Sequence, residues 1–279
     1  MAERGSTRPV IRSVIDQAYA VYKRHFLLFS LIALVAFSPL LFLAATTYGT
    51  LGGFSYRNEG ALVLSQFAIV PLLLFTQAIL VHAAFQDLRG KPINLVESLR
   101  ASGRRFLGLL GLALFATVVF VLAFFGLLLA AVYVGMGSIT YFARLGFGGL
   151  AYVVVFFEVM LFIGTLLMLV VRWCVAVPAC MIEQLGPWRS VKRSMQLTKD
   201  YRWKLFGIVL LLSLGFFVVD KLFWLIVWAL GGMAVIFVVA GIWYAMWSAF
   251  IAVILAVTYY ELRRAKEGIS LEEIAAVFD

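Results

Sequence analysis

The 279-residue chain is 64% hydrophobic and 13% charged, and it carries a formal net charge of +9. Ordinary globular domains contain about 25% charged residues, so a water-soluble fold would leave too much apolar surface exposed. The composition excludes a soluble globular protein and predicts that the bilayer solvates most of the chain. The positive charge does not predict nucleic-acid binding, because aromatic residues lie in and beside the apolar runs and do not alternate with basic residues as stacking platforms.

Six apolar runs are long enough to cross a bilayer, which takes about 20 residues. The first run exceeds the apolar core of a signal peptide, so we expect a retained span. We predict an all-α integral membrane protein that forms a single membrane domain over residues 1–279. The predicted spans lie near 26–48, 61–85, 106–134, 147–177, 205–230 and 233–260.

The Lys and Arg residues fall almost entirely on one side of these spans. Of the 23, 19 lie before the first, third and fifth spans or after the sixth, whereas the opposite loops contain only Arg57 and Arg144. Cytoplasmic loops are enriched in Lys and Arg. We therefore expect a multi-pass protein with both termini in the cytoplasm.

Three basic, amphipathic stretches, at 9–25, 93–105 and 188–202, each lead into a pair of spans. In the second, apolar residues lie on one face of a helix and Glu97, Arg100 and Arg104 on another. This pattern predicts helices that lie in the membrane interface with their cations toward headgroups. A fourth stretch, at 270–278, repeats the capping-box spacing of the second. We expect three repeats of interfacial helix, span and span, although a basic loop beside any span has a similar appearance.

The basic stretches and the adjoining span ends supply candidates for contact with lipid headgroups. Cations near an anionic leaflet are attracted to it, which predicts anionic lipids as binding partners. The candidates are Arg24, Arg104, Arg105, Arg172, Arg189, Lys192, Arg193, Arg202 and Lys204.

Glu158, Asp220 and Lys221 lie within predicted spans, where charge is costly and marks candidate functional positions. They predict either a polar pathway or a structural ion pair. Asp220 and Lys221 need not pair, because adjacent helical residues do not face each other, and Lys221 could reach toward Glu158. His82 lies near the inner interface, where a headgroup contact is expected more than a proton relay.

Catalytic signatures are sparse. The chain has two histidines, and none of its His, Cys and carboxylate residues has the spacing of a zinc site. It lacks a phosphate-binding glycine loop and a nucleophile elbow. Cys174 and Cys180 are expected to be buried apolar residues. The sequence predicts a protein without catalytic residues, cofactor or metal.

The segment from Arg172 to Gly207 and the C-terminal region resemble a bacterial membrane family, the one named after the membrane domain of glycerophosphoryl diester phosphodiesterase. The resemblance implies the bacterial cytoplasmic membrane. Some members carry a soluble phosphodiesterase barrel of about 250 residues; only a short tail follows the last span here, so that activity is not carried over. The matching residues are Arg172-Trp173, Val177-Pro178, Ile182-Glu183, Gly186-Pro187-Trp188, Lys192-Arg193-Ser194, Leu197, Arg202 to Gly207, Tyr260 to Arg263, Glu267-Gly268 and Leu271-Glu272.

These observations predict a non-enzymatic membrane scaffold or accessory subunit with a basic cytoplasmic collar that binds anionic lipids. A membrane-protein partner or a homo-oligomer is compatible with this role. Two alternatives stay open: a transporter or channel for a small solute or lipid, and an intramembrane lipid-active enzyme.

Overall fold

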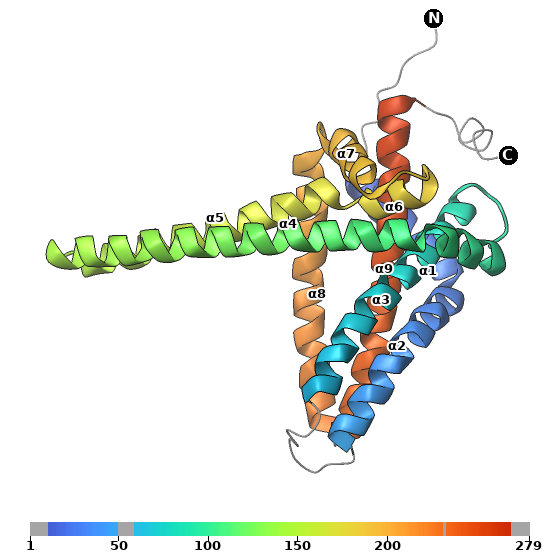
Figure 1. Cartoon of the computed structure of the whole chain (residues 1–279), viewed down its shortest axis with the longest axis horizontal. Coiled ribbons are helices and arrows are strands. Elements are labelled where there is room, and N and C mark those ends of the chain that lie inside the picture. Colours follow the sequence, from blue (N-terminus) through green and yellow to red (C-terminus); the bar gives the residue numbers. More distant parts are fainter. Residues whose placement is uncertain (1–10, 50–58, 231–232, 269–279) are drawn as a thin grey trace, which may run out of the picture.

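The computed structural model describes residues 11–49, 59–230 and 233–268, and every regular element in these ranges is an α-helix. Helices α2, α3 and α9 pack together and α8 runs beside them, while α4 and α5 form a long hairpin, the arm, that extends across and away from this bundle (Figure 1). The helices are α1 (Ile11–Arg24), α2 (Phe26–Gly49), α3 (Glu59–Leu88), α4 (Leu95–Arg144), α5 (Gly148–Trp173), α6 (Ala176–Ile182), α7 (Pro187–Thr198), α8 (Arg202–Leu230) and α9 (Met233–Glu267).

The all-helical, multi-span class predicted from the sequence is confirmed. Five of the described helices are long and apolar enough to cross a membrane, or six if the bent pair α1–α2 counts as one span. Each of the six predicted spans falls on a long helix, but the run at 147–177 is interrupted. Helix α5 ends at Trp173, and the short helix α6 starts at Ala176.

The three basic stretches differ from one another in the structure. The first is a separate helix, bent by 82° from α2 at His25, and the third is the separate helix α7. The second continues without a break into α4, a single helix of 50 residues. No proline or turn interrupts 95–106, so nothing stops the helix there. The predicted repeat therefore differs in its middle copy, and the fourth stretch, 270–278, lies outside the described residues.

Part of the apolar face of α1 and of α7 is buried against the protein, whereas Tyr19 and Trp188 stay exposed, so the expectation that these helices lie in the membrane interface stays a prediction. Val14, Ala18 and Val21 of α1 are buried, and α1 packs on α9. In α7, Val191 and Leu197 are buried with three small polar residues. Burial against neighbouring helices fixes the positions of α1 and α7.

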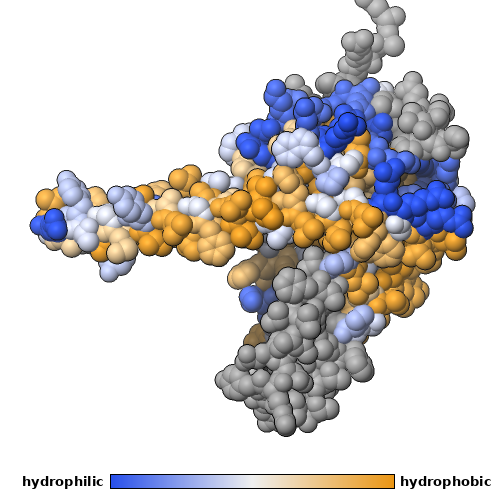
Figure 2. Space-filling view, viewed as in Figure 1, coloured by the Kyte–Doolittle hydropathy of each residue, from blue (hydrophilic) through white to orange (hydrophobic). Residues whose placement is uncertain are grey.

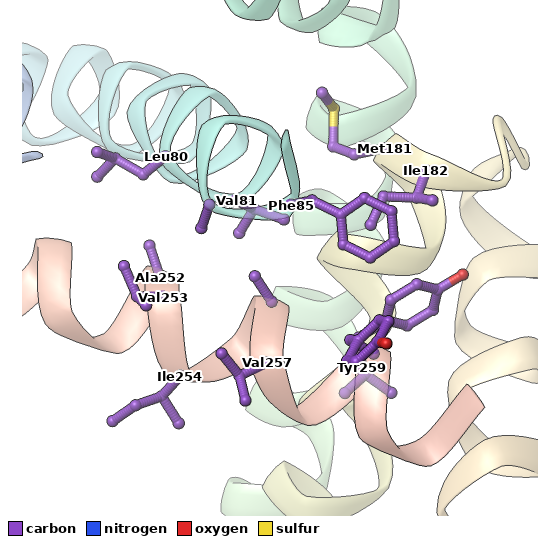
Figure 3. Packing of buried hydrophobic residues seen from close by; sticks show 14 of the residues in the cluster. Leu80, Val81, Phe85, Met181, Ile182, Ala252, Val253, Ile254, Val257 and Tyr259 are labelled. Carbon is purple, nitrogen blue, oxygen red and sulfur yellow. The ribbon is translucent and has the colours of Figure 1, made fainter. Parts of the chain in front are cut away.

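Buried apolar side chains of α3, α6 and α9 meet at one end of the bundle (Figure 3). Phe85 of α3 packs against Tyr259 of α9 with ring centroids 6.0 Å apart, beside Ile182 of α6. Buried alanines on α3 and α9 let the backbones approach, as is common where membrane helices pack. We call this end of the molecule, with the adjoining α7, the polar end.

An ion network joins α6, α7 and α9 at the polar end. Arg193 donates from Nε to both oxygens of Glu183, at 2.8 and 2.9 Å, and from a terminal nitrogen to Glu267. The Tyr259 hydroxyl donates to Glu183 at 2.7 Å, and Arg263 Nε donates to Glu267 at 2.8 Å. Burial alone lowers the pKa of Arg193, but the hydrogen bonds and charges of Glu183 and Glu267 outweigh it and raise that pKa above its usual value.

A second ion pair supports the same junction from its rim. Lys266 of α9 contacts Asp200, in the turn after α7, at 2.9 Å. This ammonium holds the pKa of the Asp200 carboxyl below its usual value. All three carboxylates of this junction, those of Glu183, Glu267 and Asp200, are thus matched by cations from α7 or α9.

At this end the arm packs on α3, and α4 also approaches the start of α7 closely. A Cβ atom on Gly111 would lie 2.9 Å from Cγ of Pro187. Phe115, one turn further along α4, packs edge-on against Trp188 with ring centroids 5.2 Å apart. The rest of the arm is little buried. In the most apolar stretch of 18 residues, 6% of the residues of α4 and none of those of α5 are buried inside the protein.

We expect Arg193→Met to lower the free energy of unfolding by about 2–3 kcal/mol, because it leaves Glu183 and Glu267 without a shared cation in a partly desolvated site. Thermal unfolding in detergent measures the loss. Arg189→Met, on the exposed face of the same helix, is the matched control. An equal effect of the two substitutions would show that the network contributes nothing beyond surface charge.

We expect Gly111→Ala to destabilise the junction of arm and bundle, since the added methyl group meets the Pro187 ring. Gly103→Ala is the control, because a Cβ there has no heavy atom within 4 Å. In the same helix, the control should gain up to about 1 kcal/mol from the better helix former. Opposite signs of the two shifts in unfolding temperature are expected, and a gain at Gly111 would contradict the close contact.

Candidate functional site

A cavity of about 660 Å³ opens at the polar end, where α3 ends, α4 begins and the loop from α6 to α7 passes. Five cations line it against a single carboxylate, that of Glu97. We call it the basic cavity. Its cations are Arg89, Lys91, Arg100, Arg104 and Arg105.

The turn between α3 and α4 forms one wall of the basic cavity. It reverses at Gly90, whose φ of +69° suits glycine. Asn94 then caps α4, since its side chain accepts the amide of Glu97 at 3.2 Å, as the predicted capping box requires. In a full capping box the Glu97 side chain would accept the backbone amide of Asn94. Here that amide donates to Gln86 Oε1 at 2.9 Å, and Gln86 Nε2 donates to the Glu97 carboxylate at 3.0 Å.

Helix α4 supplies three of the five cations, and two of them lie on one face of the helix. Glu97, Arg100 and Arg104 recur at helical spacing and all line the basic cavity. The side chains of Arg100 and Arg104 are exposed, and neither forms an ion pair with another described residue. Two guanidinium groups are thus available to an anion.

Arg105 is held at the rim by the loop after α6. Its guanidinium donates to the backbone oxygen of Gln184 at 3.1 Å and to the Gln184 side-chain oxygen at 2.5 Å. Gln184 has a φ of +53°, a left-handed conformation that costs free energy in a residue other than glycine. Both acceptors are neutral, so Arg105 keeps its full positive charge toward the basic cavity.

The opposite wall is apolar and aromatic. Phe85, Met181 and Ile182 line it, and the Arg89 guanidinium lies over the Phe85 ring at 4.4 Å. His82 also lines the basic cavity and is hydrogen-bonded through Nδ1 to Ser98 at 3.0 Å. His82 lies near the end of α3 that faces the basic cavity, and its place near the membrane interface stays a prediction. The basic cavity thus combines a cationic side with a side suited to carbon or ring atoms.

The cations predicted to contact lipid headgroups differ in what they contact in the structure. Arg193 is used in the ion network, and Arg24 pairs with Asp87 at 3.2 Å. Arg104 and Arg105 enter the basic cavity. The remaining five lie elsewhere at this end: Arg172, Arg189 and Lys192 with exposed side chains, Arg202 half-buried, and Lys204 with its ammonium 5.8 Å from the Tyr201 ring centroid.

Three cations of the basic cavity, Arg89, Lys91 and Arg100, are not among the site residues predicted from the sequence. Their charges contributed only to the number of Lys and Arg residues from which the orientation of the spans is predicted. Helical spacing identifies Arg100, because it lies one turn before Arg104 on the polar face of the basic stretch at 93–105. No local pattern predicts that Arg89 and Lys91 face the same space, because that depends on the turn at Gly90.

The intramembrane charges do not converge. Lys221 Nζ lies 3.6 Å from its neighbour Asp220, which also accepts the Tyr244 hydroxyl at 3.3 Å. Glu158 lies on the arm against Gly135 of α4, and neither of its buried carboxylate oxygens has a hydrogen-bond partner among the described residues. Lys221 is thus paired on its own helix, and the described contacts include none between it and Glu158.

The described part of the chain contains no group of three or more His, Cys or carboxylate residues that could hold a metal ion. Cys180 is fully buried and Cys174 half-buried, and both are free thiols. The chemistry that the described residues offer at the polar end is anion binding, through guanidinium and ammonium groups beside an apolar wall.

We expect Glu158→Leu to stabilise the protein by about 1–3 kcal/mol, because it removes a buried carboxylate that lacks a hydrogen-bond partner. Unfolding followed by tryptophan fluorescence in detergent measures the change. Thr165→Leu on the same helix is the control, since its hydroxyl is exposed and bonds only to the preceding turn. A lower unfolding temperature for Glu158→Leu would mean that the carboxylate has a partner in the membrane.

Comparisons with models of known protein families, with curated proteins and with solved structures give no match to this chain. The function is therefore inferred from the residues and geometry of the polar end.

Proposed function

We propose that this protein is a non-enzymatic scaffold or accessory subunit of the bacterial cytoplasmic membrane, whose polar end binds anionic lipid headgroups. The observation that carries the proposal is the basic cavity, in which five cations face one carboxylate at the end of an apolar helical body. Hydrophilic residues gather over α7 and the start of α4, while the arm is hydrophobic along most of its length (Figure 2).

Cations outside the basic cavity extend the same surface. Arg189 and Lys192 are exposed on α7, where Trp188 precedes Arg189, and the ring of Trp188 is also exposed. Tryptophan prefers the boundary between headgroups and hydrocarbon. A cation beside it lies at headgroup depth, where each one contributes about 1 kcal/mol of attraction to an anionic leaflet. The excess of Lys and Arg at this end supports a cytoplasmic position for it.

The arm supports the accessory role. Its side chains are apolar on most sides, and large residues such as Leu107, Tyr133, Tyr152 and Leu161 are between 73% and 82% exposed. In a bilayer this surface is covered by acyl chains or by another membrane protein. The proposal accordingly includes a membrane-protein partner or a second copy on the arm, with lipids bound at the polar end.

The transporter alternative has less support. Asp220 and Lys221 pair with each other, and the two described cavities are lined by neither of them nor by Glu158. The enzyme alternative requires an accessible nucleophile or acid–base pair in the basic cavity. Ser98, the partner of His82, is fully buried and does not line that space.

We expect the fourfold variant with Arg100, Arg104, Arg189 and Lys192 all changed to Gln to lose its preference for anionic lipid by about 100-fold or more, at about 1 kcal/mol per cation. Native mass spectrometry of protein exchanged into mixed micelles of phosphatidylglycerol and phosphatidylcholine measures the retained lipid.

Arg144→Gln, at the far tip of the arm, is the control and should retain the preference. If the fourfold variant keeps the lipid ratio of the unmodified protein while remaining folded, the proposal is wrong.

A further inference from the structure

We propose that the basic cavity binds the chain's own acidic C-terminal segment, residues 269–279, and that this segment competes there with anionic lipid. We call the segment the acidic tail; it lies outside the described residues. This inference rests on the proposed function, because it names what regulates the lipid site of the polar end.

The acidic tail differs in charge from the three basic stretches. It contains Glu272, Glu273 and Asp279 and no Lys or Arg. Helices that lie in a membrane interface carry mainly Lys and Arg on their polar face. An anionic leaflet repels carboxylates by the same field that attracts cations. A basic surface of the protein is therefore a better partner for the acidic tail than the headgroups are.

Three cations of α4 give the basic cavity the complementary charge. Arg100 and Arg104 have no ion pair or hydrogen bond with another described residue, and Arg105 donates to neutral oxygens of Gln184. Because Arg100 and Arg104 lie one turn apart, neighbouring carboxylates can contact both. Guanidinium and carboxylate groups form charge-assisted bonds that are often bidentate. The three carboxylates of the acidic tail match these three cations in number.

The apolar residues of the two partners also correspond. Leu271, Ile274 and Phe278 recur at helical spacing, so a helix over the acidic tail presents them on one face. Beside its cations the basic cavity has an apolar wall that includes Phe85 and Ile182. Its volume of about 660 Å³ is that of a pocket able to hold several side chains. An amphipathic helix set into a groove with its apolar face inward is a common mode of peptide recognition.

The end of α9 brings the acidic tail within reach of the basic cavity. One guanidinium binds both Glu267, the last residue of α9, and Glu183, the residue before Gln184. Gln184 lines the basic cavity and contacts Arg105. Arg100 lies about 7.5 Å further back along α4. The eleven residues of the acidic tail extend up to about 36 Å, which exceeds this path.

Hydrogen–deuterium exchange of the purified full-length chain, in a neutral maltoside detergent without anionic lipid, tests the contact. We expect the amides of 270–278 to exchange about tenfold or more slowly than those of a synthetic peptide of residues 269–279. Arg100→Gln with Arg104→Gln should abolish this protection. Arg189→Gln with Lys192→Gln removes the same charge outside the basic cavity and should preserve it. Unfolding temperatures of both double variants confirm that they are folded.

A charge exchange tests whether the contact is direct. Arg100→Glu with Arg104→Glu should remove the protection, and the addition of Glu272→Lys with Glu273→Lys should restore it. A combined variant that stays unprotected would overturn the inference. So would protection that survives in both Gln double variants, which assigns the acidic tail to the detergent interface, or protection that is lost on dilution, which assigns it to a second copy.

Lipid binding then tests the competition. The tail variant with Glu272→Gln, Glu273→Gln and Asp279→Asn should retain phosphatidylglycerol about fivefold or more tightly than the unmodified chain, because a larger fraction of the cavities is open. Native mass spectrometry in the same mixed micelles measures the difference. Equal retention by the two chains would contradict the competition.

The outcomes also separate this inference from the proposed function. If the acidic tail exchanges as freely as the peptide while the protein prefers anionic lipid, the inference fails and the proposed function stands. If the tail is protected through Arg100 and Arg104 but neither the unmodified chain nor the tail variant prefers anionic lipid, the tail contact stands. The proposed function and the competition with lipid then both fail.

Discussion

The structure depends on the ion network in which Arg193 of α7 joins Glu183 and Glu267. These carboxylates come from the end of α6 and the end of α9, which are far apart in the sequence. Each partner is mostly withdrawn from water, so an unmatched charge there would be costly. The network fixes α7 on the bundle, and α7 in turn contacts the base of the arm at Gly111 and Phe115. The relative positions of bundle, arm and basic cavity follow from this junction.

The positive charge of the chain serves two physical purposes at one end of the molecule. Arg193 and Arg263 neutralise half-buried carboxylates and hold helices together. Arg100 and Arg104 face an open space and have no ion pair with another described residue. A count of cations does not separate these roles, since both kinds satisfy the rule that orients membrane proteins. The separation decides where an anion binds, because only the second kind is available to a ligand.

The length of α4 limits how the arm can lie in a membrane. At 1.5 Å per residue, the 50 residues of α4 extend about 75 Å, more than twice the thickness of about 30 Å of a hydrocarbon core. An upright α4 would carry apolar side chains far into water, so the helix must tilt strongly or extend within the headgroup region. The polar end is packed and ion-paired, whereas the arm beyond its base is little buried within its own chain.

The sequence by itself determined the helical membrane class, the six apolar runs and the concentration of cations on one side, because hydropathy and charge act through local composition. It also predicted the cap of α4 at Asn94, since capping depends on neighbouring residues. Only the tertiary structure decided that α1 and α7 pack on neighbouring helices and that the basic stretch at 93–105 continues into α4. It also decided that Asp220 pairs with Lys221. It also brought Arg89 and Lys91 to the same space as Arg100. These features depend on contacts between segments far apart in the chain and on the turn at Gly90, so helical spacing within one segment does not contain them.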